Sequence, residues 1–408
     1  MASTRAVGVR LSLFYGTLFL TVGLIGPYWP VWLESRGMGP SQIGLLMAIS
    51  FLTRTITNPA IGALVDRRGD RRRPMLVLAA MSLGAYALFW PAQGFWPLAA
   101  LTILAAGSFT AIMPLGDSLT LLASSEGRLD YGRIRLWGSL SFIVASMIGG
   151  AVIERHPTDA LLWFLSATLA ALIGACAMLP DGRAAGRRVD DGHDRPIATA
   201  PGGARTLRRL ATQPVFLLFL VAASAIHISH LVYYGFGALH WQAAGLSLDA
   251  IGLLWAEGVL AEVAVFAGAA VLLRRVSPPR LLALAGLAAA LRWTVLGLTA
   301  EPLALVLVQS LHAFSFGACH LGAMHFIAAA APRSASAGAQ ALYSSLAAGL
   351  LPGIGMLGAG RLYSALAGGA YLISAAVALI AAVLAVILER RWSGGELTLD
   401  ASTRPRAA

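Results

Sequence analysis

The chain has 408 residues, of which 58% are hydrophobic and only 12% are charged, and its mean hydropathy is +0.74. A soluble domain carries about a quarter charged residues, so this composition excludes an ordinary soluble protein. The formal net charge of +11 would suit a nucleic-acid-binding protein only if the charges formed one basic surface. Their distribution instead follows the loops of a membrane protein, and we predict no nucleic-acid partner.

Twelve stretches of roughly 18 or more mostly apolar residues are spread along the chain. Lipid offers no hydrogen-bond partner to backbone amides, so segments this apolar are expected to be helices. We therefore predict an all-α membrane protein with 12 transmembrane helices in contact with the lipid bilayer. The segments are 11–33, 41–65, 74–92, 96–123, 136–153, 159–179, 214–243, 248–273, 279–299, 303–331, 338–360 and 369–389.

Arginines are distributed unevenly between the two sides of these segments. If the N-terminus is cytoplasmic, 25 arginines fall on the cytoplasmic side and three on the other, while Arg54 and Arg292 lie within apolar segments. Excess positive charge marks the cytoplasmic loops of membrane proteins. We therefore predict a multi-pass protein of the cell inner (plasma) membrane with both termini cytoplasmic.

An internal repeat and a hydrophilic stretch divide the chain. IGLLMAISFLTR at 43–54 returns 208 positions later as IGLLWAEGVLAE at 251–262, so that the copies end on Arg54 and Glu262. Duplicated bundles of this kind are typical of transporters. We predict two pseudo-symmetric six-helix bundles, at 1–180 and 214–392, joined by a cytoplasmic linker at 181–213 and followed by a cytoplasmic tail at 393–408.

The residues of the chain give little support for an enzymatic function. Cys176 and Cys319 both fall inside apolar segments and give no disulfide framework or metal-ligand spacing. The sequence also lacks a recognisable nucleophile–base motif and a phosphate-binding loop. We predict no enzymatic activity, no metal and no cofactor. A membrane enzyme or a transporter-like sensor is the alternative class; the first would alter a solute chemically, and the second would bind it without net flux.

Ionisable residues inside the apolar segments are the first candidates for function. Insertion of such a side chain at mid-bilayer costs about 2.5–3.5 kcal/mol, so these residues are expected to face a cavity or a partner. An anionic substrate needs a fixed cation, which makes Arg54 and Arg292 substrate-binding candidates. A proton carrier needs a group whose charged form desolvation disfavours, and Glu262 and Asp117 fit this description. Glu257 is a further candidate, but it lies about 140° from Glu262 around a helix.

Structural alternatives exist for each of these groups. Arg54 and Asp117 could form an ion pair that holds two helices together. Glu262 could pair permanently with Arg292 and would then carry no proton, although symporters commonly use such a pair as a switch. His312 is a further proton-coupling candidate, with a hydrogen-bonded interior histidine as the alternative.

Polar aromatic residues suggest where a ring-bearing substrate would bind. His227, His230 and Tyr234 follow at spacings of three and four and so share one helix face, with Tyr233 beside them. Aromatic side chains with polar ends suit a pocket for such a substrate. We predict His230, Tyr233 and Tyr234 as substrate-binding residues and Tyr28 as a weaker candidate; the alternative is helix–helix packing.

The loop GALVDRRGDRRRP at 62–74 resembles the major facilitator signature G-x-x-x-D-R-x-G-R-R, with Asp70 where the signature has a basic residue. In that superfamily the motif gates conformational change. Gly62 is expected to allow close helix approach and Asp66 to cap a neighbouring helix. The Tyr131–Arg135 loop is expected to lock the cytoplasmic gate; the alternative is contact with substrate. The predicted gating residues are Gly62, Asp66, Arg67, Gly69, Arg71, Arg133 and Arg135.

A closer resemblance is to the phenylpropionate permease family, which is related to nucleoside–proton symporters and lactose permease. It rests on PYWPVWL (27–33), PLGDSL (114–119), YGRIRLWGS (131–139), HLVYYGFGALHWQAAG (230–245) and LHAFSFGACHLGAMHFI (311–327). It implies the major facilitator fold and proton-coupled import of 3-phenylpropionate or a similar aromatic carboxylate. The alternatives are a nucleoside or sugar proton symporter and a drug or metabolite efflux antiporter. We also predict that the protein is a monomer.

Lactose permease also has an arginine and a histidine with the separation of Arg292 and His312. It carries a glutamate three residues after that histidine, where this chain has Ser315. The resemblance therefore implies that the proton site lies at Glu262 or Glu257.

Overall fold

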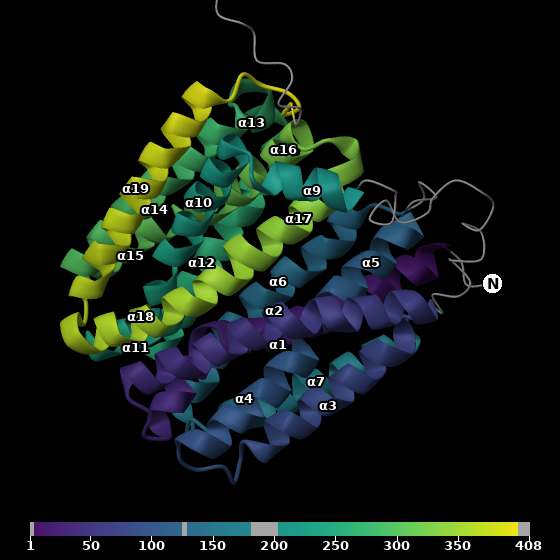
Figure 1. Ribbon diagram of the computed structural model, residues 1–408. Helices are drawn as coiled ribbons and strands as arrows, with labels where there is room; N and C mark the ends of the chain where they lie inside the picture. Colours follow the sequence, from purple (N-terminus) through teal and green to yellow (C-terminus); the bar gives the residue numbers. More distant parts are fainter. Residues whose placement is uncertain (1–3, 125–128, 181–202, 399–408) are drawn as a thin grey trace, which may run out of the picture.

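The structure, a computed structural model, describes residues 4–124, 129–180 and 203–398, and every regular element in these ranges is a helix (Figure 1). The N-terminal group of helices is α1 (Thr4–Ser35), α2 (Pro40–Arg68), α3 (Arg72–Leu88), α4 (Phe95–Phe109), α5 (Ile112–Ser124), α6 (Tyr131–Arg155) and α7 (Ala160–Met178).

The C-terminal group follows a short helix, α9 (Gly203–Ala211). Its first members are α10 (Pro214–Ser229), α11 (Leu231–Ala243), α12 (Leu248–Ala267), α13 (Ala269–Arg275), α14 (Pro278–Leu298), α15 (Pro302–Gln309), the π-helix η2 (Ala313–Ala318) and α16 (Cys319–Ala330). Its last members are η3 (Arg333–Ala335), α17 (Ser336–Ser345), the π-helix η4 (Leu346–Leu350), α18 (Leu351–Leu366) and α19 (Gly369–Arg391).

All twelve predicted apolar segments fall on helices, and the described residues contain ten helical segments that are long and apolar enough to cross a membrane. The two predicted segments outside this set are α2 and α3. Helix α2 has a polar middle around Arg54, and α3 has only 17 residues. The chain is thus a multi-pass helical membrane protein, and the count of twelve spans stays a prediction.

Several predicted segments are interrupted, which the apolar pattern does not reveal. Pro114 follows the break between α4 and α5 and lacks the N–H that would bond to the carbonyl of Thr110. Pro352 follows η4 and lacks the N–H that an α-helix would offer to the carbonyl of Ala348. Proline therefore accounts for two of the interruptions, and in both cases it frees a carbonyl from the helical ladder.

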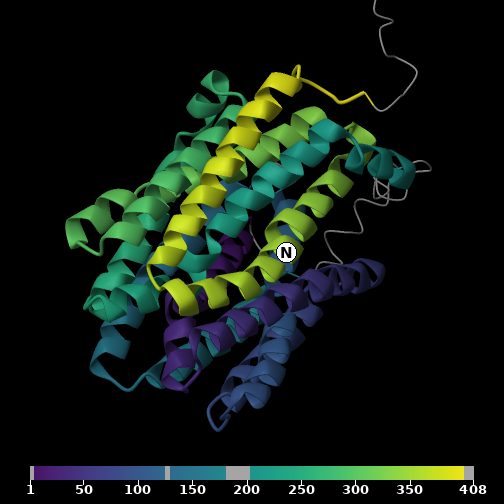
Figure 2. The same ribbon diagram turned by 60° about the vertical axis from the view of Figure 1, so that its left-hand side comes forward.

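The two groups of helices lie side by side, α1–α7 in purple and blue and α10–α19 in teal to yellow (Figures 1 and 2). They meet mainly where α2 packs on α18 and α6 packs on α12. A Cβ atom on Gly44 would lie 2.7 Å from the Cα atom of Gly360, and one on Gly252 would lie 2.3 Å from the carbonyl oxygen of Ser146. Small residues thus bring the backbones of the two groups into direct contact, as at many helix interfaces in membranes.

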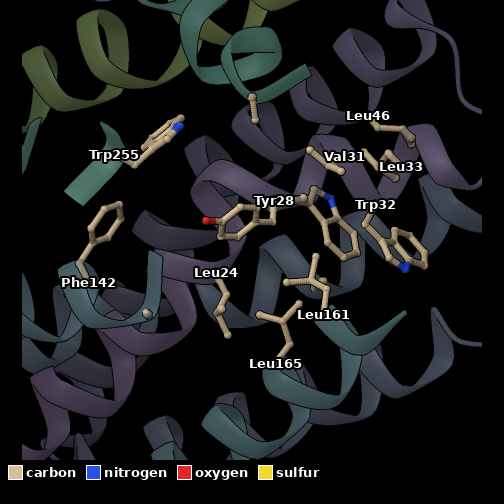
Figure 3. Close-up of a cluster of buried hydrophobic side chains, with 14 of the residues drawn as sticks. Leu24, Tyr28, Val31, Trp32, Leu33, Leu46, Phe142, Leu161, Leu165 and Trp255 are labelled. Carbon is tan, nitrogen blue, oxygen red and sulfur yellow. The ribbon is translucent and has the colours of Figure 1, made fainter. Parts of the chain in front are cut away.

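Further contacts lie where α6 packs on α12. Tyr28 is fully buried and donates its hydroxyl hydrogen to the carbonyl of Ser146, beside Gly252. Figure 3 shows its ring among labelled side chains of α1, α6, α7 and α12. Arg155 forms two hydrogen bonds with the carboxylate of Asp249, at 3.1 and 3.2 Å. Arg155 and Asp249 lie next to the connections 156–159 and 244–247, so the two groups converge at this end of the molecule.

The predicted linker is only partly described. Residues 181–202 lie outside the described ranges, and 203–211 form α9, whose Leu207 and Leu210 are directed towards the protein. Of the predicted tail, residues 399–408 also lie outside the described ranges. The division into two six-helix bundles stays a prediction.

Candidate functional site

Arg292 in α14 is the centre of a buried polar network. Its side chain is fully buried; the guanidinium donates two hydrogen bonds to Oε1 of Gln309 and one, at 2.9 Å, to Nδ1 of His312. It also lies over the rings of Tyr233, at 4.3 Å, and Trp293, at 4.6 Å. A buried charge is tolerated when its N–H donors are satisfied, and here protein groups satisfy them. Arg292 therefore belongs to the scaffold of the site.

His312 connects this network to Glu262. Because the guanidinium of Arg292 can only donate, Nδ1 of His312 accepts, and the neutral ring carries its proton on Nε2. That nitrogen lies 3.6 Å from Oε2 of Glu262. The direct ion pair between Glu262 and Arg292, one of the alternatives from the sequence, is not formed. The Glu262 side chain is 19% exposed and forms no ion pair with an arginine among the described residues.

Gln309 and three aromatic rings extend the network. Nε2 of Gln309 donates to the Tyr233 hydroxyl at 3.1 Å and to the Leu254 carbonyl at 3.0 Å. The Tyr233 ring stacks on Trp255 with a centroid separation of 4.7 Å, and Tyr234 lies 6.3 Å from the same indole. The indole nitrogen of Trp255 is buried and has no hydrogen-bond partner in the described part of the chain. Tyr233, Tyr234 and Trp255 thus form an aromatic wall beside the network.

The predicted stripe on one helix face is split, because the helix is interrupted at His230 between α10 and α11. His230 contacts Ser315 through Nε2 at 3.3 Å and stacks with Tyr234 at 5.7 Å, so both residues join the Arg292 network. His227 instead contacts the Tyr343 hydroxyl at 2.9 Å. The structure thus brings His230, Tyr233 and Tyr234 together and places His227 elsewhere.

The π-helix η2 begins directly after His312. Its Ser315 lies within hydrogen-bond distance of both His230, at 3.3 Å, and Arg292, at 3.5 Å. A Cβ atom on Gly317 would lie 3.7 Å from Cγ of Glu262. Single π turns inside longer helices occur frequently at functional sites. Here the π-helix presents a hydroxyl to the polar network and a glycine to the carboxylate.

Arg54 lies apart from that network, on α2. Its guanidinium donates one hydrogen bond, of 2.9 Å, to the carbonyl of Ala348 in η4 and lies 4.0 Å from the ring centre of Phe51. The remaining N–H groups have no partner among the described residues and are not enclosed by the protein. The ion pair with Asp117 considered from the sequence is not formed.

Asp117 accepts hydrogen bonds from two tyrosines instead, from Tyr15 at 2.5 Å and from Tyr131 at 3.1 Å. Near it, the guanidinium of Arg135 lies over the ring of Phe19 at 4.1 Å and over that of Tyr15 at 5.3 Å. Arg135 forms no ion pair within the described ranges. The structure therefore places Arg135, one of the predicted gating residues, against the aromatic rings of α1.

Two other candidates have no contact with the Arg292 network. Glu257 is partly exposed on α12 and makes no hydrogen bond or ion pair with the described residues. Tyr28 is occupied by its hydrogen bond to Ser146 at the contact between the two groups. Of the two glutamates on α12, only Glu262 therefore touches the network.

The gating motif forms a compact turn. Gly69 ends α2 with φ of 68°, a left-handed conformation that favours glycine, and Asp66 pairs with Arg71 at 3.1 Å. Asp70, not Asp66, caps the following helix, because its carboxylate accepts from the backbone N–H of Arg72 at 3.1 Å. This corrects the prediction that Asp66 caps a neighbouring helix. It also gives a structural role to Asp70, which stands where the signature has a basic residue.

The other predicted gating residues lie at the surface of the turn or contact neighbouring elements. Nε of Arg71 donates to Ser118 in α5 at 3.0 Å, which ties the turn to a neighbouring helix. Gly62 has open space around it, so the expected close helix approach does not occur there. Arg67 is exposed, and the exposed Arg133 pairs with Asp130 at 3.6 Å.

The fold and the site define a multi-pass helical membrane protein with a buried polar network, and comparison with known proteins identifies it as a transporter. The family model described as "MFS_1 like family" matches residues 9–373, and the chain belongs to this family of major facilitator transporters. It is 32% identical to a probable 3-phenylpropionic acid transporter of Escherichia coli K12, over 92% of this chain and 96% of that protein.

Two further comparisons support the same family and fold. The chain is 27% identical to a maltose permease of Geobacillus stearothermophilus, over 94% of this chain and 95% of that protein. Its fold is similar to the crystal structure of the nucleoside transporter NupG, with a TM-score of 0.81, 12% identity and coverage of 95% of this chain and all of that one. The relatives are transporters and not enzymes, which agrees with the prediction from the sequence.

Proposed function

We propose that the protein imports a small aromatic carboxylate, such as 3-phenylpropionate, together with protons by alternating access. The observation that carries the proposal is the position of Glu262. Its partly exposed carboxylate faces the N–H of His312 and lacks an arginine partner among the described residues. A carboxylate at this depth is costly when charged, and a proton removes that cost. Glu262 is thus suited to bind and release a proton during the transport cycle.

The substrate class rests on two features. The aromatic wall of Tyr233, Tyr234 and Trp255 suits a ring. Arg54 supplies a cation whose N–H groups are mostly unused, whereas those of Arg292 are occupied. The name of the relative from Escherichia coli supports an aromatic acid as the first substrate to test.

The proposed orientation places both termini in the cytoplasm, in agreement with the arginine distribution. The end at which the two groups converge would then face outwards, and the structure would correspond to an inward-facing state. The inner membrane is the proposed location and the monomer the proposed functional unit.

The test is uptake of labelled 3-phenylpropionate into proteoliposomes with an inward proton gradient. We expect accumulation by the wild-type protein, and its loss in Glu262→Gln with exchange of substrate across the membrane retained. The matched control is Glu301→Gln, the same substitution at an exposed position, which should accumulate substrate normally. Glu257→Gln decides between the two glutamates of α12. Gradient-driven accumulation by Glu262→Gln would rule out its role in coupling.

The same vesicles distinguish the alternatives. Uptake of maltose or uridine without uptake of 3-phenylpropionate would favour the sugar or nucleoside symporter. Extrusion of the solute against an opposite gradient would favour an antiporter.

A further inference from the structure

The carbonyl of Ala348 lacks its normal helical partner for a covalent reason. In an α-helix it would accept from the amide four residues later, which belongs to Pro352 and has no N–H. A backbone carbonyl inside a membrane protein must find another donor, since lipid offers none. Arg54 of α2 provides it at 2.9 Å. The bond therefore joins the N-terminal group of helices to the C-terminal group.

Close packing supports this contact. A Cβ atom on Gly349 would lie 2.7 Å from Oγ1 of Thr55, and one on Gly353 would lie 3.2 Å from Cβ of Phe51. Two glycines of the η4–α18 segment thus let α2 approach. Without them the guanidinium of Arg54 could not remain at hydrogen-bond distance from the carbonyl.

A neutral carbonyl is a weak partner for a guanidinium. Arginine binds a carboxylate through two parallel, charge-assisted hydrogen bonds, which are roughly twice as strong as neutral ones. Arg54 has unused N–H groups that the protein does not enclose. An anion that reaches Arg54 would therefore compete successfully with Ala348.

We propose that Arg54 is the subsite for the substrate carboxylate and that the carbonyl of Ala348 occupies it in the empty protein. Binding of the carboxylate exchanges one acceptor for the other and removes the hydrogen bond between α2 and η4. Loading of substrate thereby loosens one of the contacts between the two groups of helices. The carboxylate exchange rests on the proposed function, whereas the link between Arg54, Ala348 and Pro352 does not.

The link is tested without substrate by a double-mutant cycle of thermal stability in detergent. Arg54→Gln should lower Tm in the wild-type background, because the carbonyl loses its donor. In the Pro352→Ala background the helix supplies an N–H to Ala348, so Arg54→Gln should have little effect. The control cycle combines Arg54→Gln with Pro302→Ala, an exposed proline at the start of α15, and should be additive. Additive effects in the Pro352 cycle would overturn the link.

A second variant covers the case in which Pro352→Ala does not fold. Gly349→Ala forces α2 away from η4 at the Thr55 contact and should make the effect of Arg54→Gln smaller in the same way. An undiminished effect of Arg54→Gln in that background would also count against the link.

Ligand binding tests the exchange, with 3-phenylpropionate and its neutral amide as probes. Arg54→Gln should weaken binding of the acid by roughly 10- to 100-fold, the range expected for hydrogen bonds to a charged group. Binding of the amide should change little. Pro352→Ala should tighten binding of the acid by about threefold, because Arg54 no longer has to leave the carbonyl.

The outcomes separate the two proposals. Equal weakening of acid and amide by Arg54→Gln would overturn the carboxylate subsite and leave the proposed function intact. Absence of binding of either probe to the wild-type protein would overturn the proposed function and with it the exchange. The stability cycle would still decide whether Arg54 satisfies the carbonyl that Pro352 frees.

Discussion

Replacement of Arg292 tests whether this residue is scaffold or substrate anchor. Arg292→Gln removes two hydrogen bonds to Gln309 and one to His312, together with contacts to the rings of Tyr233 and Trp293. Hydrogen bonds between membrane helices contribute about 0.6 kcal/mol each, so the three contribute about 2 kcal/mol. Two cation–π contacts at about 1 kcal/mol each bring the loss to roughly 4 kcal/mol.

This loss should be measurable as a lower Tm in detergent. At about 2 °C for each kcal/mol in a large chain, we expect a decrease on the order of 5–10 °C. The matched control is Arg280→Gln, the same substitution on the same helix at a side chain that is 67% exposed and pairs with Glu389. An exposed ion pair contributes about 0–1 kcal/mol, so this control should stay near wild type. A wild-type Tm for Arg292→Gln combined with loss of substrate binding would refute the scaffold role.

Three further predictions concern the contact between the two groups and the gating turn. Gly252→Ala should force the two groups of helices apart and so increase the labelling of cysteines introduced nearby. The control is Gly174→Ala, where a Cβ atom would meet nothing within 4 Å and labelling should not increase. Equal labelling of the two variants would contradict the packing argument. Tyr28→Phe removes a buried hydrogen bond and should lower the free energy of unfolding by about 0.5–1.5 kcal/mol, measured by denaturant titration; no change would show that the bond is dispensable. Asp70→Ala removes a helix cap and should lower the free energy of unfolding by about 0.5–2 kcal/mol in the same titration. A change outside this range would speak against capping.

The long apolar stretches of the sequence were sufficient to predict helices at all twelve places, because lipid forces every such segment into the same structure. They did not predict where helices break. The interruptions at Pro114 and before Pro352 depend on one missing N–H in each case. Prolines are common in membrane helices, and their number does not indicate which of them changes the hydrogen-bond pattern.

The sequence identified the ionisable members of the site but not how they are connected. Arg292, His312 and Glu262 were recognised as charged or titratable groups inside apolar segments. Their order, with the histidine between the other two, depends on helix packing that no spacing rule contains. Gln309 was missed, although an amide within an apolar segment is itself a signal, since a buried amide needs several partners.

The ring of Trp255 was missed for a different reason. Tryptophan is common at membrane surfaces, so its position in the sequence alone does not indicate a binding wall. Its significance lies in the stacked Tyr233 and in the indole N–H that has no partner within the described ranges. Both are properties of the packed structure.

The π-helix η2 has a consequence for how sequences of this kind can vary. An α-helix turns by about 100° for each residue, so an insertion or deletion of one residue rotates everything beyond it by that angle. A π turn instead takes up one extra residue without that rotation, so a single-residue deletion between His312 and Cys319 would restore a regular α-helix and leave α16 in its present orientation. Alignments of related chains should therefore show single-residue gaps in this segment more often than in the uninterrupted membrane helices.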